Sequence, residues 1–257
     1  VRRGRIQFVR QEPMIEDSVK YSSSIEYVNQ TDEIVREAIR QSLSGRPGPA
    51  YIEYPSHVIL EDLDVPEVLP PHRYRLVNQG ADIDRVAEAA KAIKEAKKPI
   101  LLVGHGVHTS RTGAAVKDLA MLMNCPVVQT SGGTSYIEGL EDRTFQYVFS
   151  DASLEAVEES DLVLALGTEL GEPLHYGKTR WWEDNDANRT WILVEQDPTA
   201  IGVNRPIDIP LVGDLRGVVP QLVTALRNQP RDPAPGLAAF MKDGQDELDA
   251  LAEESLA

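Results

Sequence analysis

Between residues 82 and 227, short apolar runs alternate with stretches in which apolar residues recur at helical spacing. An unbroken apolar run is typical of a strand buried on both faces, as in the middle of a parallel sheet. Such runs predict strands at Ile100–Val103, Val127–Thr130, Leu162–Leu166, Trp191–Val194 and Leu211–Val212. The helical spacing predicts helices over 83–97, 113–124, about 153–159 and 215–227, with a short turn at 198–202. This alternation predicts an α/β fold with a doubly wound parallel sheet.

The first 60 residues form a smaller unit with fewer elements. A helix is predicted to begin at Thr31, with acidic residues in its first turn, and to end at Gly45. A short strand, Ala50–Tyr54, follows and is ended by Pro55. One helix and one strand bury too little surface for an independent core. We therefore expect residues 1–60 to be a partial α/β domain that needs partners.

Two further segments separate or follow these units. Residues 61–81 contain prolines and show no periodicity, which predicts a linker before a second domain over 82–228. Residues 229–257 are acidic and helix-like, and we expect them to lead toward a further domain. The chain begins with Val1 rather than methionine. We therefore expect it to be a piece of a longer protein.

Composition excludes several classes of function. The net charge of −15 argues against a nucleic-acid partner, because the sequence contains no basic stripe that could bind phosphates. No apolar run approaches the roughly 20 residues of a membrane span, and no signal peptide is visible. The single cysteine, Cys125, cannot form an internal disulfide, so a cytoplasmic location is expected. Its position between a helix end and Pro126 favours a buried core thiol over a nucleophile.

Glycines or acidic residues follow nearly every predicted strand. They are Gly104 and Gly106, Gly132 and Gly133, Gly167 with Thr168, Glu195 with Asp197, and Gly213 with Asp214. Because parallel strands point the same way, all of these residues should gather on one edge of the sheet. Open α/β sheets bind their ligands at that edge. The pattern therefore predicts a nucleotide-binding domain.

The individual motifs are less specific than their arrangement. The Gly104-His105-Gly106 turn lacks the third glycine of the dinucleotide fingerprint, which makes a redox dehydrogenase a weak interpretation. The turn from Thr130 to Gly133 offers amides and hydroxyls for a phosphate, or is only a tight turn. Glu195 can accept hydrogen bonds from a ribose diol. For Asp197 a helix-capping role is favoured.

No catalytic or metal-binding pattern emerges from the residues alone. The histidines show no metal-ligand spacing, and neither a Ser-His-Asp order nor a pair of carboxylates stands out. His175 lies in LHYGKTRWW, which suggests either an anion or aromatic contact or, as the favoured interpretation, a loop anchored by buried tryptophans. The sequence therefore predicts no metal site.

Several stretches resemble a known family when they are taken together. They are SGRPGPAYIEYPSHV, KPILLVGHGV, PVVQTSGG, DLVLALGT and VEQDPTAIGVNRPIDIPLVGDL. The chain is similar to thiamine-diphosphate-dependent enzymes of the acetolactate synthase and 2-keto-acid decarboxylase type. The resemblance implies the end of the pyrimidine-binding domain over 1–60, then a Rossmann-like central domain. In that family the thiamine diphosphate and Mg²⁺ sites lie in parts that this chain does not contain.

The resemblance also implies a ligand, FAD or ADP, on the central domain. Arg46 would face the flavin, Gly104 and Gly106 would line the cofactor, and Thr130 and Ser131 would lie nearby. Gly167 and Thr168 would contact the middle of the cofactor, and Glu195 and Gln196 would contact its adenosine end. Asp214 would lie on the last turn of the site. Two departures weigh against FAD: the run Thr168–Glu172 lacks the arginine of the family, and Ser56 replaces a lysine.

The activity expected from the resemblance belongs to a parent protein. That protein would form or cleave a carbon–carbon bond in pyruvate or another 2-keto acid, and would be a homodimer or homotetramer. The resemblance places Gln7 beside the active site of a neighbouring subunit, and we expect no catalytic residue in this chain alone. The alternative is a standalone adenine-nucleotide-binding or scaffolding module without catalysis.

Overall fold

The computed structural model describes residues 9–64, 66–133, 137–228 and 230–256. The chain divides into two compact units, Val1–Val77 and Asn78–Ala257, and each is described by itself. None of the helices in these described ranges is long and apolar enough to cross a membrane.

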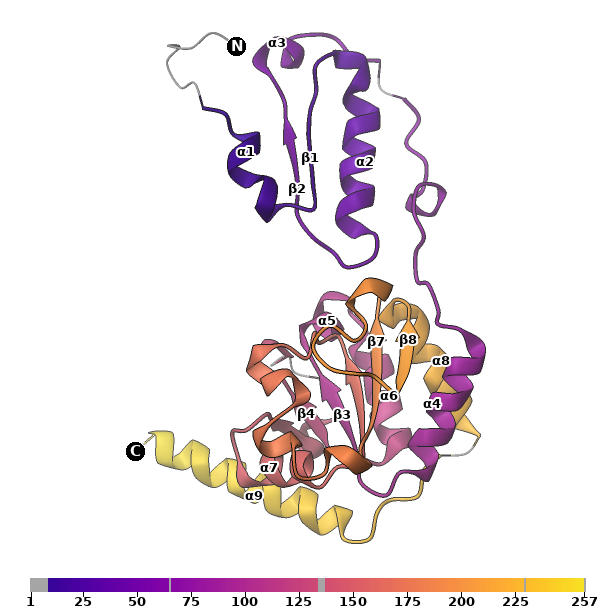
Figure 1. Cartoon of the computed structure of the whole chain (residues 1–257), viewed down its shortest axis with the longest axis vertical. Coiled ribbons are helices and arrows are strands. Elements are labelled where there is room, and N and C mark those ends of the chain that lie inside the picture. The colour runs from indigo at the N-terminus through magenta and orange to yellow at the C-terminus, as the bar shows by residue number, and fades with distance from the viewer. Residues whose placement is uncertain (1–8, 65, 134–136, 229, 257) are drawn as a thin grey trace. The chain divides into compact units, whose positions relative to one another are not determined.

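The first unit contains a two-stranded parallel sheet with a helical crossover (Figure 1). Strand β1 (Tyr21–Ser24) pairs with β2 (Ala50–Glu53), and helix α2 (Thr31–Leu43) connects them. Two single-turn helices, α1 (Glu12–Ile15) and α3 (Ser56–Ile59), lie before and after this motif in the chain. A parallel pair cannot be joined by a tight turn, so α2 is the element that makes this pairing possible.

The sequence predicted α2 and β2 but not β1. The sequence of β1 is Tyr-Ser-Ser-Ser, which has no apolar run, and all four of its residues are only half-buried. The buried apolar side chains in the described part of this unit are Ile25, Ala38 and Val58. These residues bury little apolar surface, and the need of this unit for partners stays a prediction.

The second unit is a six-stranded parallel sheet with the strand order β5-β4-β3-β6-β7-β8. Its strands are β3 (Pro99–Val103), β4 (Val127–Gln129), β5 (Thr144–Gln146), β6 (Leu162–Leu166), β7 (Thr190–Glu195) and β8 (Ile209–Val212). The central strand β3 pairs on both sides, with Leu101 opposite Val127 of β4 and Leu164 of β6. Every residue of β3 and β6 is buried. The predicted doubly wound parallel sheet is confirmed.

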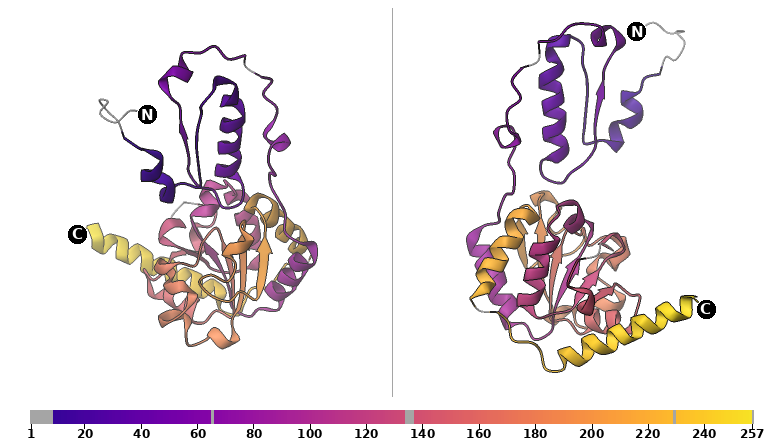
Figure 2. Two further views of the ribbon diagram at one scale, coloured as in Figure 1. Left: turned by 45° about the horizontal axis from the view of Figure 1, so that its top comes forward. Right: turned by 180° about the vertical axis from the view of Figure 1, so that it is seen from behind.

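Helices cover both faces of this sheet (Figure 1, Figure 2). The elements are α4 (Ile83–Glu95), α5 (His105–Thr109), α6 (Gly113–Met123), α7 (Asp151–Glu158), α8 (Leu215–Arg227) and α9 (Leu237–Leu256). Residues from α4, α6 and α8 form one core with the strands, and α7 helps to form the core on the other face. The short elements α5 and β5 were not predicted from the sequence.

A long loop between β6 and β7 covers the face that α7 leaves open. Its Trp182 side chain is fully buried and stacks on Tyr147, with ring centroids 5.8 Å apart. The indole Nε1 donates to the Tyr147 hydroxyl and to the Leu174 carbonyl, each at 2.9 Å. The Tyr147 hydroxyl lies 3.1 Å from His175 Nδ1. This is the tryptophan-anchored loop that the sequence favoured around His175.

The backbone of the same loop is unusual. Its non-glycine residues with a left-handed φ are Leu170, His175, Tyr176, Thr179 and Arg180. Each such residue costs on the order of 1–3 kcal/mol unless its surroundings enforce the conformation. Two buried arginines support the loop: Arg205 lies 3.8 Å from the Trp191 ring centroid, and Arg189 donates to the Trp182 carbonyl at 2.6 Å. Burial lowers the pKa of both guanidinium groups.

Helix α9 lies on the outside of the unit beside α7, and its carboxyl-terminal end extends past the rest of the unit (Figure 1, Figure 2). Met241 of α9 forms a small apolar core with Phe145 and Ala152. Gly244 allows the close approach, because a Cβ there would lie 2.6 Å from the Phe145 ring. Most of the acidic segment 229–257 is therefore helical, and part of that helix packs on the sheet domain.

Candidate functional site at the carboxyl edge of the sheet

The strand order places a switch point between β3 and β6. The first strand of the unit, β3, has β4 on one side and β6 on the other, so the chain leaves it in opposite directions. Ligands of open α/β sheets bind outside the carboxyl ends of strands at such a point. The candidate residues of the second unit lie at the end of β7 or on the turns that follow β3, β4, β6, β7 and β8, and therefore on this one edge.

The turns after β3 and β6 touch each other through glycines. The Gly104 amide donates to the Leu166 carbonyl and the Gly106 amide to the Gly167 carbonyl, both at 2.9 Å. A Cβ on Gly104 would lie 2.3 Å from the Gly167 oxygen, and one on Gly106 would lie 2.6 Å from the Gly167 Cα. These glycines let two turns pack backbone to backbone. Their amides are therefore engaged within the protein.

The turn after β4 packs on β3 in the same way. The Thr130 amide donates to the Val103 carbonyl at 3.0 Å, and Thr130 is buried. A Cβ on Gly133 would lie 2.3 Å from the same carbonyl oxygen, so glycine is needed there too. Ser131 between them is exposed. Of the residues expected on this turn, Ser131 is therefore the accessible one.

The turns after β7 and β8 share a polar cluster. Gln196 donates through Nε2 to the Asp214 carboxylate at 2.7 Å, and Arg216 donates through Nε to the same carboxylate at 2.9 Å. Burial raises the Asp214 pKa, but the hydrogen bonds and positive charge of Arg216, with the bond from Gln196, outweigh burial and lower it. Asp214 therefore stays ionised near neutral pH.

The Glu195 carboxylate is half-buried beside this cluster. One oxygen, Oε1, accepts the backbone N–H groups of Gln196 at 2.8 Å and Asp197 at 3.1 Å. No hydrogen bond from a described residue reaches the other oxygen, Oε2, which leaves it able to accept from a hydroxyl. Asp197 caps the next turn through Thr199, whose amide lies 2.9 Å from Oδ1, as predicted.

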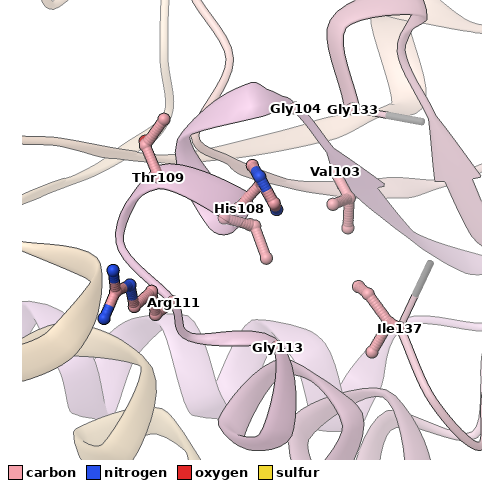
Figure 3. Close-up of a pocket in the computed structure, with 9 residues that line it drawn as sticks. Val103, Gly104, His108, Thr109, Arg111, Gly113, Gly133 and Ile137 are labelled. Carbon is pink, nitrogen blue, oxygen red and sulfur yellow. The ribbon is translucent and has the colours of Figure 1, made fainter. Parts of the chain in front are cut away.

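A cavity of about 540 Å³ lies beside the glycine contact (Figure 3). Its described walls come from the end of β3, from α5, from the start of α6, and from Gly133 and Ile137, which follow β4 in the chain. The lining residues are Val103, Gly104, Val107, His108, Thr109, Arg111, Gly113, Gly133 and Ile137. Sequence reasoning named Gly104 but not Arg111 or His108 as binding residues, because HTSRTG contains no recognisable motif.

The remaining expected residues lie elsewhere. Arg46 belongs to the first unit, on the turn after α2, where the Lys20 ammonium donates to its carbonyl at 2.9 Å. Gln7 lies outside the described residues. Cys125 is fully buried, and burial raises its pKa to about 12, which makes it unsuited to nucleophilic chemistry. The described residues contain no group of three His, Cys, Asp or Glu side chains arranged to hold a metal ion.

Comparison with known proteins agrees with this architecture. The family model described as the thiamine pyrophosphate enzyme central domain matches residues 86–222. A probable acetolactate synthase large subunit of Methanococcus aeolicus is 28% identical over 215 residues, which cover 81% of this chain and 35% of the relative. An acetolactate synthase of Mycobacterium leprae is 29% identical over 209 residues, covering 76% of this chain and 31% of the relative.

A third relative, an acetolactate synthase large subunit of Haemophilus influenzae, is 26% identical over 217 residues, covering 82% of this chain and 37% of the relative. The chain thus spans about a third of the length of these curated relatives. The matched residues contain α6, α7, and all six strands of the second unit. The chain belongs to the acetolactate-synthase-like family of thiamine-pyrophosphate-dependent enzymes and contains the central domain of that family.

Proposed function

We propose that this chain is part of a thiamine-diphosphate- and Mg²⁺-dependent enzyme that acts on pyruvate or another 2-keto acid. The proposal is supported by the central-domain match over residues 86–222 and by the acetolactate synthase relatives. Thiamine diphosphate, when bound, supplies the nucleophile and the electron sink for carbon–carbon chemistry beside a carbonyl. This chain alone is expected to be inactive, because the resemblance assigns the thiamine diphosphate and Mg²⁺ sites to other parts of the family's architecture.

Within that enzyme, we propose that the second unit binds an adenosine nucleotide along the carboxyl edge of its sheet. The observation that supports this most directly is Glu195: its Oε1 is fixed by two backbone amides, and its Oε2 accepts no hydrogen bond from a described residue. A carboxylate held in this way at a strand end is suited to a ribose diol. Gln196 and Asp214, joined at 2.7 Å, would border the same end of the ligand.

The edge is better suited to a ligand's adenosine end, around Glu195, than to a diphosphate beside the turn after β6. The turn after β6 contains Thr168, Glu169 and Glu172 but no arginine. Carboxylates there would disfavour the diphosphate of FAD and of ADP alike, so the affinity expected for either ligand comes from its adenosine end. Arg46 belongs to the first unit, and the flavin contact that the resemblance implies for it stays a prediction. FAD and ADP share the adenosine portion, so binding experiments must distinguish them.

The test uses the full chain. Dialysis after addition of FAD, followed by an absorption spectrum, shows whether flavin is retained, and calorimetric titration measures ADP binding. We expect ADP to bind and Glu195→Gln to weaken it about tenfold, because the amide keeps one acceptor oxygen but loses the charge. Glu158→Gln, on the exposed surface of α7, is the matched control. Failure of both FAD and ADP to bind would exclude a nucleotide at this edge.

A further inference from the structure

A second cavity, of about 250 Å³, lies at the amino-terminal edge of the sheet. Its walls come from the residues that precede and begin β3, from those that precede β4, from α7, and from the segment that leads into α9. The residues that line it lie in the ranges 97–126, 155–159 and 231–240, which the structure describes without a gap. The five residues of β3 span about 15 Å at about 3.3 Å per residue. The second cavity is therefore separate from the carboxyl edge and from Glu195.

Much of the lining of the second cavity is apolar. Its larger apolar side chains are Pro99, Ile100, Pro126, Pro235, Leu237 and Phe240. Phe240 is held by an edge-to-face contact with Phe145, with ring centroids 5.8 Å apart. Sites for drug-sized ligands have volumes of about 300–1,000 Å³, so this smaller cavity suits a ligand whose apolar part is a single ring.

Lys97 lines the same cavity, and its backbone is fixed on both sides. Its amide donates to the Asp161 carboxylate at 2.7 Å, and its carbonyl accepts a hydrogen bond from the Arg231 guanidinium. The neighbouring Lys98 forms an ion pair with Glu159. The Lys97 ammonium, in contrast, forms no ion pair with any residue that the structure describes. It is therefore available to a charged group of a ligand.

The charges of the described lining favour an anion, although the chain has a net charge of −15. Lys97, Lys98 and Arg231 are cationic, and Glu155 and Glu159 are the carboxylates among the described lining residues. The hydrogen bonds of the Arg231 guanidinium to described residues all go to backbone carbonyls, so no carboxylate neutralises it. The first turn of α9 contains no acidic residue, which leaves the positive end of that helix dipole uncompensated. The helix end supports this preference and would not define a site without the cavity.

We propose that the second cavity binds a small aromatic carboxylate, with the ring between the apolar side chains and the carboxylate beside Lys97. The charged group lies at the mouth, where it keeps contact with water, because an apolar interior cannot hold an unpaired charge. The ligand contacts residues of both α7 and the start of α9, so its binding holds α9 against the sheet domain. The site is independent of the nucleotide proposed at Glu195.

Benzoate is the probe that tests the proposal. Ligand-observed NMR with the full chain at low ionic strength should show binding with a dissociation constant of roughly 1 mM or below. Benzyl alcohol, which has the ring but no charge, should bind about tenfold more weakly. Lys97→Gln should weaken benzoate by the same factor and leave benzyl alcohol unchanged. Lys91→Gln, an exposed lysine on α4, removes the same charge and should change neither ligand. Absence of benzoate binding, or equal losses in the two lysine variants, would overturn the proposal.

Three further variants test the location of the ligand. Ala234→Phe adds a ring to the cavity wall and should abolish benzoate binding, with circular dichroism as the check that the variant is folded. Glu155→Gln removes a negative charge from the lining and should strengthen benzoate binding. Glu195→Gln should leave benzoate affinity unchanged, and Lys97→Gln should leave ADP affinity unchanged, so the two proposed sites can fail separately. Full benzoate affinity in folded Ala234→Phe, or weaker binding in Glu155→Gln, would contradict a site in this cavity.

Discussion

The Glu247 carboxylate on α9 accepts the backbone N–H of Asp151, the first residue of α7, at 2.7 Å. Its second oxygen accepts the next amide, that of Ala152, at 3.1 Å. A carboxylate at a helix N-terminus satisfies amides that have no partner within the helix and interacts favourably with the helix dipole. A polar cap therefore joins α9 to α7, in addition to the apolar contacts around Phe145.

Replacement of Glu247 by alanine should loosen α9 from the domain. Loss of two capping hydrogen bonds should reduce the free energy of unfolding by about 1–2 kcal/mol. Urea denaturation measures the loss, and hydrogen exchange should show faster exchange of the Asp151 and Ala152 amides. Glu253→Ala, on the exposed part of the same helix, should change neither quantity. Unchanged exchange in Glu247→Ala would show that the apolar contacts alone hold α9.

Arg231 joins the carboxyl-terminal ends of α4 and α6. Its guanidinium donates to the Ala96 carbonyl at 2.8 Å and to the Asn124 carbonyl at 3.2 Å, and Arg231 is buried. Arg231→Ala should destabilise the domain by about 3 kcal/mol, because several partly buried carbonyls lose a charged donor. Thermal or urea unfolding measures the change, with exposed Arg227→Ala as the control. Equal stability of the two variants would rule out this role.

Alanine at Gly104 should disturb the contact between the turns after β3 and β6. The added Cβ would lie 2.3 Å from the Gly167 carbonyl oxygen, so one turn would have to move. We expect a loss of stability of several kcal/mol, on the order of an overpacked core substitution or more. Gly171→Ala is the control, since its Cβ would meet only Pro173 at 3.9 Å. A native-like melting curve for Gly104→Ala would contradict the described backbone contact.

The stability of the domain should fall in alkaline solution because of Cys125. Burial raises its pKa to about 12 in the folded chain, against about 8.5 when unfolded. Between these two pKa values the folded state binds more protons than the unfolded state. The free energy of unfolding therefore decreases as pH rises, by at most about 1.4 kcal/mol per pH unit. Cys125→Ala should flatten the dependence above pH ~9. An identical pH profile in the variant would exclude this contribution.

The sequence predicted the central strands because their burial leaves a continuous apolar run. Predicted Leu162–Leu166 is the observed β6, and predicted Ile100–Val103 lacks only the first residue of β3. The prediction for β8 began late, at Leu211, because Pro210 interrupts the apolar pattern; an edge strand tolerates proline. At the other edge, β5 is too short, at three residues, to show a pattern.

The position of the candidate site was also predictable, but its internal contacts were not. Parallel strands required the residues after β3, β6 and β7 to share an edge, whatever their side chains. The sequence did not reveal that Gly104 and Gly167 would touch each other, because this contact depends on the spacing of β3 and β6. Arg111 was missed for a similar reason: its place in the wall of the cavity beside Gly104 is a property of the folded chain.

The left-handed backbone of the loop from Leu170 to Arg180 has a consequence for the order of folding. Its residues would not adopt these conformations in an isolated peptide, because each is disfavoured locally. The surfaces that enforce them, such as Trp191 and Arg205, exist only once β6, β7 and β8 have paired. The loop should therefore be the last part of this face to become ordered. Its conformation is determined by contacts with the sheet rather than by the local preferences of its own residues.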